Sequence, residues 1–150
     1  MDLLQIDWQT VLYHATQLIF AYALALPIGW DREVSRRQFG LRTFPLVAVV
    51  TCGFMLVGMS VIESTDGEAR VIQGIITGIG FIGGGAILKD QDKVAGTASA
   101  ASIWNTGAIG LSVACKRYEI AILLAALNFF TLFVFGKTKK EMSSSQEEHD

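Results

Sequence analysis

Acidic and basic side chains gather in one short segment near the start of the chain. The candidate functional residues of this segment are Asp31, Arg32, Glu33, Arg42 and Thr43. Two carboxylates this close together could coordinate a cation, because Asp and Glu oxygens are the usual ligands of hard metal ions. They could equally pair with the neighbouring arginines and form a salt-bridged loop at a helix end. The residues leave both interpretations open, and Asp31 and Glu33 are the candidate ligands if a metal binds.

A second segment, from Gly74 to Leu88, is rich in glycine, and its candidate contact residues are Gly78, Gly80, Gly83 and Gly85. The pairs Gly74/Gly78 and Gly80/Gly84 are each spaced by four residues, which places small residues on one helix face and lets another backbone approach. Consecutive glycines also weaken a helix by about 1 kcal/mol each. A loosened backbone is tolerated within a membrane only where it is buried or lines a cavity. Tight packing and a binding site on a flexible helix both remain open.

A third segment, from Gly96 to Gly110, carries hydroxyls and one amide, and its candidate residues are Ser102, Trp104 and Asn105. An amide inside an apolar stretch must find a hydrogen-bond partner, because lipid offers none. Ser99, Ser102 and Thr106 have the spacing of one helix face. We expect this face to pack on the glycines of the second segment. A structural and a functional role are equally open for Asn105, whereas His14 and Gln17, one turn apart, are expected to form a structural pair.

Five uncharged stretches separate these clusters, and each is long enough to cross a bilayer. They run Trp8–Trp30, Thr43–Ile62, Val71–Leu88, Val94–Cys115 and Ile120–Gly136. About 20 apolar residues span a hydrocarbon core of about 30 Å, and 51% of this chain is hydrophobic. The sequence therefore predicts an all-α integral membrane protein, a bundle of five transmembrane helices within residues 1–140. The predicted spans are about 9–30, 44–62, 71–88, 96–115 and 120–136, followed by a disordered cytoplasmic tail over 141–150.

Basic residues predict how this bundle is oriented. The first loop holds four, the third loop two and the segment after the last span three, which places nine on one side against three on the other. Short loops rich in Lys and Arg face the cytoplasm. We therefore expect the N-terminus outside and the C-terminus inside the cell.

Several function classes have no support in the residues. The net charge of −2 and the lack of a basic tract argue against a nucleic-acid partner. Cys52 and Cys115 both fall inside predicted spans and are expected to act as small apolar side chains. No span carries a deep Asp, Glu, Lys or Arg, the groups that ion pumps usually keep there. We expect no cofactor and no enzymatic activity.

The three segments together resemble the membrane domain of the MgtC/SapB family. The similarity is carried, in order, by Gly29-Trp-Asp-Arg-Glu, Gly40-Leu-Arg-Thr, Gly78-Ile-Gly-Phe-Ile-Gly-Gly-Gly85, Gly96-Thr-Ala-Ser-Ala-Ala-Ser-Ile-Trp104 and Gly107-Ala-Ile-Gly110, within about residues 15–135. Asp31 stands where the family usually has Glu, Gly84 where it has Ala, and the glycines that usually precede Tyr118 are missing. The soluble C-terminal domain of many members is not present in these 150 residues.

The resemblance implies a bacterial inner-membrane protein linked to growth at low magnesium and, in pathogens, to survival in a host. It also implies action through other membrane proteins, with the ATP synthase as the expected partner. The sequence thus predicts a non-enzymatic membrane protein that works by helix–helix contact in the lipid bilayer and forms a homo-oligomer, with a dimer expected. The alternative is a small oligomeric transporter or channel for a cation, lined by Asp31, Glu33 and Asn105.

Overall fold

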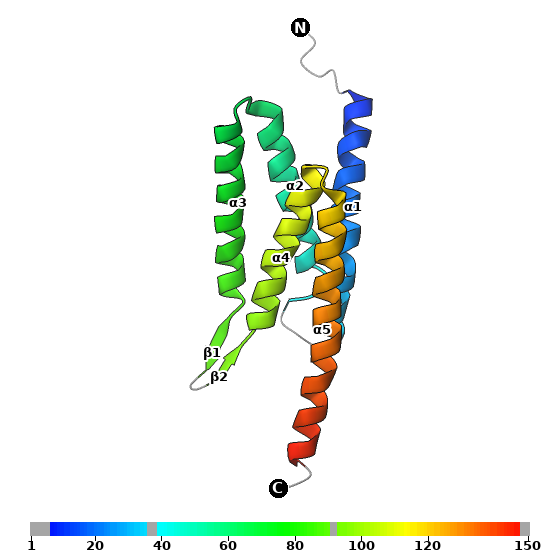
Figure 1. The fold of residues 1–150 in the computed structure, drawn as a ribbon, viewed down its shortest axis with the longest axis vertical. Helices are drawn as coiled ribbons and strands as arrows, with labels where there is room; N and C mark the ends of the chain where they lie inside the picture. The colour runs from blue at the N-terminus through cyan, green and yellow to red at the C-terminus, as the bar shows by residue number, and fades with distance from the viewer. Residues whose placement is uncertain (1–6, 36–38, 91–92, 148–150) are drawn as a thin grey trace.

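The computed structural model describes residues 7–35, 39–90 and 93–147. Five helices run side by side along one long axis (Figure 1). They are α1 (Trp8–Val34), α2 (Thr43–Val61), α3 (Thr65–Gly85), α4 (Thr97–Ala114) and α5 (Tyr118–Glu147). A two-stranded hairpin, β1 (Leu88–Asp90) and β2 (Lys93–Ala95), connects α3 to α4 at what we call the lower end of the bundle. The prediction of five helices is confirmed.

The helices differ from the predicted spans mainly at their ends. α3 begins six residues earlier than Val71, because the Ser64 side chain accepts a hydrogen bond from the Gly67 N–H and caps the helix. Asp66 and Glu68 lie in its first turn, where negative charge stabilises a helix. α5 continues past Gly136 to Glu147. The sequence predicts disorder over residues 141–150, but the backbone is helical as far as residue 147. Lys, Glu, Met and Gln, which occur in this tail, are all good helix formers. Residues 148–150 lie outside the described part of the chain.

The connection between α3 and α4, expected as a plain loop, contains an antiparallel pair of strands. Leu88 pairs with Ala95 and Asp90 with Lys93, so that only residues 91–92, which are not described, join the strands. At its end Gly96 adopts a left-handed backbone with φ of +85°, and a Cβ there would collide with the Ala86 carbonyl oxygen. Only glycine allows the chain to turn from β2 into α4 this way.

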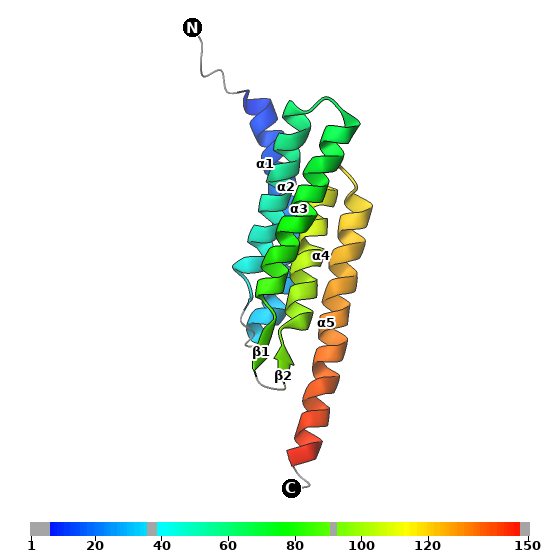
Figure 2. The ribbon, with the colours of Figure 1, turned by 90° about the vertical axis from the view of Figure 1, so that its left-hand side faces the viewer.

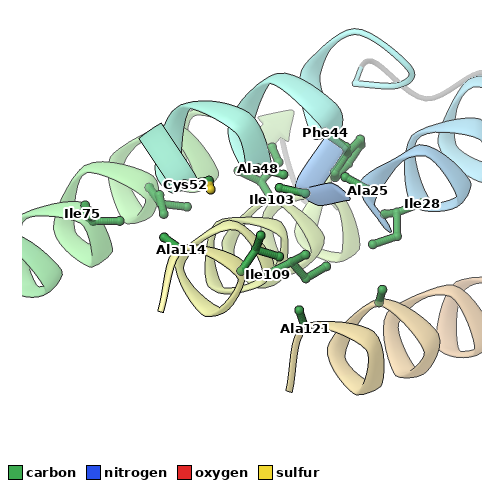
Figure 3. Close-up of a cluster of buried hydrophobic side chains, with 14 of the residues drawn as sticks. Ala25, Ile28, Phe44, Ala48, Cys52, Ile75, Ile103, Ile109, Ala114 and Ala121 are labelled. Carbon is green, nitrogen blue, oxygen red and sulfur yellow. The ribbon is translucent and has the colours of Figure 1, made fainter. Parts of the chain in front are cut away.

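α4 lies at the centre of the bundle, where it packs against the other four helices (Figure 2). Glycine makes this close packing possible: Gly110 lies against the backbone of Ala48 in α2, and Gly107 lies against the Ile79 side chain of α3. The core joins side chains from all five helices (Figure 3). Its largest fully buried apolar members are Phe44, Ile28, Met55, Ile103 and Ile109.

Large apolar side chains cover the outside of the bundle as well. Leu12, Phe54, Phe81, Leu127 and Phe135 are each more than 60% exposed. Three helical segments are long and apolar enough to cross a membrane within the described residues: Trp8–Val34, Thr43–Val61 and Tyr118–Gly136. α3 and α4 fall short on composition, because α3 begins with polar turns and is rich in glycine, and α4 is rich in Ala, Ser and Thr.

Candidate interaction site

The charged segment at the end of α1 is held together by its own residues. Arg32 is buried, with 6% of its surface exposed, and its Nη2 and Nε donate to Asp31 Oδ2 at 2.8 and 3.2 Å. Glu33 Oε2 accepts from the Leu41 N–H at 3.2 Å. Both carboxylates therefore already have partners within the protein, and no group of three or more metal-ligating side chains exists in the described residues.

The same contacts fix the start of α2. The loop passes close to α1 at this point, because a Cβ at Gly40 would meet the flexible end of the Glu33 side chain and lie 3.2 Å from the Glu33 Cα. The Gly40 carbonyl oxygen accepts from the Thr43 and Phe44 N–H groups at 3.0 and 3.3 Å and opens the helix. Arg42 itself is exposed at the N-cap position. The segment thus joins α1 to α2 and leaves Arg42 as its outward charge.

The glycines of α3 divide into one packed position and several open ones. Gly83 is buried, and a Cβ there would approach the Ala100 carbonyl oxygen of α4 to 3.2 Å. At Gly78, Gly80 and Gly85 an added Cβ would meet nothing within 4 Å. α3 and α4 therefore meet through Gly83, but at Ala100 and not at the hydroxyl face that was expected to pack there. Gly78, Gly80 and Gly85 have no contact of this kind.

An apolar groove runs between α2 and α3, and we call it the α2–α3 groove. Its volume is about 640 Å³. The lining residues are Leu46, Val47, Val50, Thr51, Phe54, Val57, Gly58, Val61, Ile62, Val71, Gly74, Ile75, Gly78, Ile79 and Ile82. Gly74 and Gly78 form a bare strip in the α3 wall of the groove, because a Cβ added at either position would meet no atom within 4 Å. Gly80 does not line the groove.

Two amides and a hydroxyl connect α4 to α5. The Ser102 hydroxyl and Asn128 Oδ1 are 2.9 Å apart, and Asn105 Nδ2 donates to the Leu124 carbonyl oxygen at 3.3 Å. Asn128 Nδ2 is buried and has no hydrogen-bond partner among the described residues. Trp104 points outward, with 55% of its surface exposed. Ser102 of the predicted hydroxyl face therefore meets α5, as Asn105 does, and not the glycines of α3 on which that face was expected to pack.

Two polar residues take part in ways that the sequence analysis did not identify. Asn128 was missed, although a lone amide within an apolar span is the same signal that marked Asn105. Gln17 is buried, and its Nε2 donates to the Val113 and Ala114 carbonyl oxygens at 3.3 and 3.5 Å. It thereby gives the Ala114 carbonyl at the end of α4 a partner and shares the Val113 carbonyl with the Lys116 N–H. The His14 ring lies beside that of Tyr13 and not with Gln17.

Outside the bundle, two groups have shifted pKa values. A hydrogen bond from the Thr10 side chain, with a further one from the Gln9 N–H, lowers the pKa of Asp7, the N-cap of α1. Contact with the Tyr13 side chain raises the pKa of Lys116, whose Nζ lies 5.4 Å from the centre of the Tyr13 ring. Asp7 directly precedes α1 and Lys116 lies in the turn between α4 and α5, whereas the charged segment follows the other end of α1.

A helical bundle with apolar outer faces and membrane-length helices defines the class as a helical membrane protein. The chain belongs to the MgtC family, whose sequence profile matches residues 18–141 and so includes all three candidate segments. This match confirms the resemblance that the motifs indicate.

Curated relatives support the same assignment. The chain is 31% identical to Protein SrpB of Synechococcus elongatus, over 89% of this chain and 78% of SrpB. It is 33% identical to the putative magnesium transporter YhiD of Escherichia coli K12 (79% and 59%) and 36% identical to Protein MgtC of Brucella abortus (69% and 43%). The chain therefore spans less than two thirds of YhiD and of MgtC. No solved structure matches it.

Proposed function

We propose that this chain is a non-enzymatic regulator of the bacterial inner membrane, and that it binds a transmembrane helix of another membrane protein in the α2–α3 groove. All five helices span the bilayer in this proposal, with the N-terminus outside and the lower end at the cytoplasmic surface. The Lys and Arg residues near the lower end support that orientation. The resemblance to the MgtC/SapB family supports a role in adaptation to low magnesium or to a host.

The bare glycine strip in the groove is the observation that carries the proposal. In lipid, apolar surface alone gives no drive to associate, so helices pair where small residues let their backbones come close. Gly74 and Gly78 are four residues apart, line the groove together and have no neighbour within 4 Å. An uncharged helix with a small-residue face fits this lining, which contains no ionisable side chain. The expected owner of that helix is the ATP synthase.

Gly78 and Gly80 form a matched pair for the test. Both are exposed glycines of α3 with open space at the Cβ, and they lie two residues apart and hence on opposite helix faces. A photocrosslinking residue at Phe54, which lines the groove, would be combined with Gly78→Leu or Gly80→Leu in intact membranes. We expect a crosslink to an ATP synthase membrane subunit that Gly78→Leu abolishes and Gly80→Leu preserves. Equal crosslinking in both variants, crosslinks to lipid only, or crosslinked dimers of this chain would each contradict the proposal.

The transport alternative uses the charged segment instead of the groove. It requires Asp31 and Glu33 to face a passing cation, yet Asp31 pairs with Arg32 and Glu33 accepts from the Leu41 N–H. These contacts favour the contact-based function. Purified protein in liposomes, loaded with a magnesium-sensitive dye, checks the choice: we expect no flux above that of empty liposomes, and a saturable flux that Asp31→Asn removes would establish transport.

A further inference from the structure

A second cavity, at the start of α4, gathers hydrogen-bond donors rather than apolar surface. We call it the α4 N-terminal pocket. Its volume is about 330 Å³, and its walls come from the end of α1, from the chain that leads from β2 into α4, and from α5. In Figure 2 the start of α4 follows the hairpin directly at the lower end of the bundle. This pocket is separate from the α2–α3 groove and shares only the Arg32 side chain with the charged segment.

The backbone of α4 contributes unpaired N–H groups to this pocket. Gly96 is the N-cap and has no side chain to cap the helix, and the first N–H of α4 with a carbonyl partner is that of Ala100, 2.8 Å from the Gly96 oxygen. The N–H groups of residues 97–99 thus have no acceptor among the described residues. A helix N-terminus of this kind carries partial positive charge and attracts anions.

The side chain of Ser99 provides a second, independent indication of a ligand. Ser99 lines the pocket and is only 5% exposed, yet its hydroxyl makes no hydrogen bond within the described residues. Thr106 and Ser112, further along α4, instead donate to the carbonyl four residues before. The Ser99 oxygen is not one of the sealed unpaired atoms of the described residues, so it is open to the pocket and free to donate to a group bound there.

Arg32 adds a guanidinium group, paired with Asp31, to the same space. It is 6% exposed and lines the pocket, and its Nε and Nη2 are held by Asp31. Its Nη1 donates to nothing in the part of the chain that the structure describes. Asp31 therefore orients the guanidinium and leaves one pair of N–H groups for a ligand. Three kinds of donor with no acidic residue in the lining suit an anion and disfavour a cation.

We propose that the α4 N-terminal pocket binds a phosphate group, through Arg32 Nη1, the Ser99 hydroxyl and the first N–H groups of α4. The donors come from two helices, and a phosphate has several charged oxygens that can accept from all of them. The predicted spans end at residue 30 and begin at residue 96, so in the orientation of the proposed function, on which this step rests, the pocket lies at the level of the cytoplasmic headgroups. Both a phospholipid headgroup and free phosphate can reach it, and Leu132 and Phe135 give it an apolar wall that fits the glycerol end of a lipid.

Ser99→Ala and Ser102→Ala are the matched variants for the test. Both serines are buried in α4 and lie one turn apart, but Ser102 bonds to Asn128 and does not line the pocket. The purified full chain in detergent would be titrated with inorganic phosphate against chloride of equal ionic strength, with the unfolding temperature as readout. In parallel, native mass spectrometry would count retained phosphatidylglycerol against digalactosyldiacylglycerol, a lipid without phosphorus.

We expect the wild-type chain to bind at least one of the two phosphate sources, with phosphatidylglycerol preferred over the phosphorus-free lipid. Loss of one hydrogen bond to a charged group should weaken this binding about tenfold in Ser99→Ala, and Ser102→Ala should bind like the wild type. Stabilisation by inorganic phosphate assigns the pocket to free phosphate, and retention of phosphatidylglycerol alone assigns it to a headgroup. Binding of neither source, or equal affinity in Ser99→Ala and the wild type, would overturn the proposal. Circular dichroism would verify that each variant is folded.

Discussion

Gly110→Ala tests the claim that α4 occupies the centre of the bundle because its small residues let other backbones approach. Gly110 is buried, and a methyl group there would collide with the Ala48 carbonyl oxygen and lie 3.1 Å from the Ala48 Cα. The obstacle is the backbone of α2 and not the end of a flexible side chain, so α2 and α4 must move apart. The change also affects the core around them, because Ala48 is itself fully buried.

The expected change in the free energy of unfolding follows from two opposing effects. Forcing one methyl group into a well-packed core costs about 1–3 kcal/mol, and a rigid backbone obstacle belongs at the upper end. Alanine stabilises a helix by about 1 kcal/mol relative to glycine. We therefore expect Gly110→Ala to lower the free energy of unfolding by about 2 kcal/mol. Gly84→Ala is the matched control, because a Cβ at Gly84 meets nothing within 4 Å and only the helix-propensity gain remains.

Reversible unfolding by SDS in mixed micelles, followed by circular dichroism, measures both variants. Gly110→Ala should unfold at lower SDS than the wild type, and Gly84→Ala at equal or higher SDS. A Gly110→Ala protein as stable as the wild type would refute the close approach of α2 and α4. A large loss of stability in Gly84→Ala would instead show that the outer face of α3 is covered in the membrane protein as purified.

Further predictions concern single contacts. Gly96→Ala should destabilise the turn from β2 into α4, because the backbone at Gly96 is left-handed and a Cβ there would collide with the Ala86 carbonyl oxygen. SDS unfolding measures this loss of stability, and an unchanged midpoint would contradict the geometry. Lys116→Gly should stabilise the chain by about 1 kcal/mol, since Lys116 has a φ of 58°, and a drop in stability would mean that its contact with the Tyr13 ring matters more. A double-mutant cycle of Ser102→Ala and Asn128→Ala should give a coupling of about 0.6–1.5 kcal/mol, and additive losses would exclude their hydrogen bond. The pKa of Asp7 is lower in the folded chain than in the unfolded chain, so the Asp7 carboxylate stabilises α1 above its unfolded pKa, and this stabilisation is lost as the pH falls through its folded pKa. The helix content of the wild type should therefore fall in acid, and the helix content of Asp7→Asn should not show this fall.

The five helices were predictable because charge is confined to the connections between them. The length of each apolar stretch alone predicts most of the helix ends to within a few residues. The start of α3 was missed, since its first turns are polar and are fixed by the Ser64 cap and not by hydropathy. The turn between α4 and α5 gave no signal either. Lys116 there occupies the left-handed position of a Schellman motif, with Lys116 N–H bonded to Val113 O at 3.0 Å and Arg117 N–H to Ser112 O at 2.8 Å, a position where glycine is usual.

The roles of individual glycines could not be predicted from their spacing. A four-residue interval shows that two glycines share a helix face, but not whether that face meets a neighbour. Gly83 packs on α4 while Gly78, five residues before it, remains bare. Which face is covered depends on the tilt and neighbours of α3, and these are set by long-range contacts that no local pattern contains. The same holds for Ser99 and Ser102, which lie one turn apart and differ only in what their helix packs against.

The number of neighbours of each helix explains where sites for other molecules can lie. α4 contacts all four other helices, so its buried positions run around its whole circumference and its small residues are used for internal packing. α3 packs chiefly on α4 and α2 and buries only the stripe Ile75, Ile79 and Gly83. Glycine in α4 is thus needed for the fold, whereas glycine on the free faces of α3 lowers helix stability without an internal contact in return. A residue type that weakens its own helix and packs on nothing within the chain is best explained by a contact with something outside it.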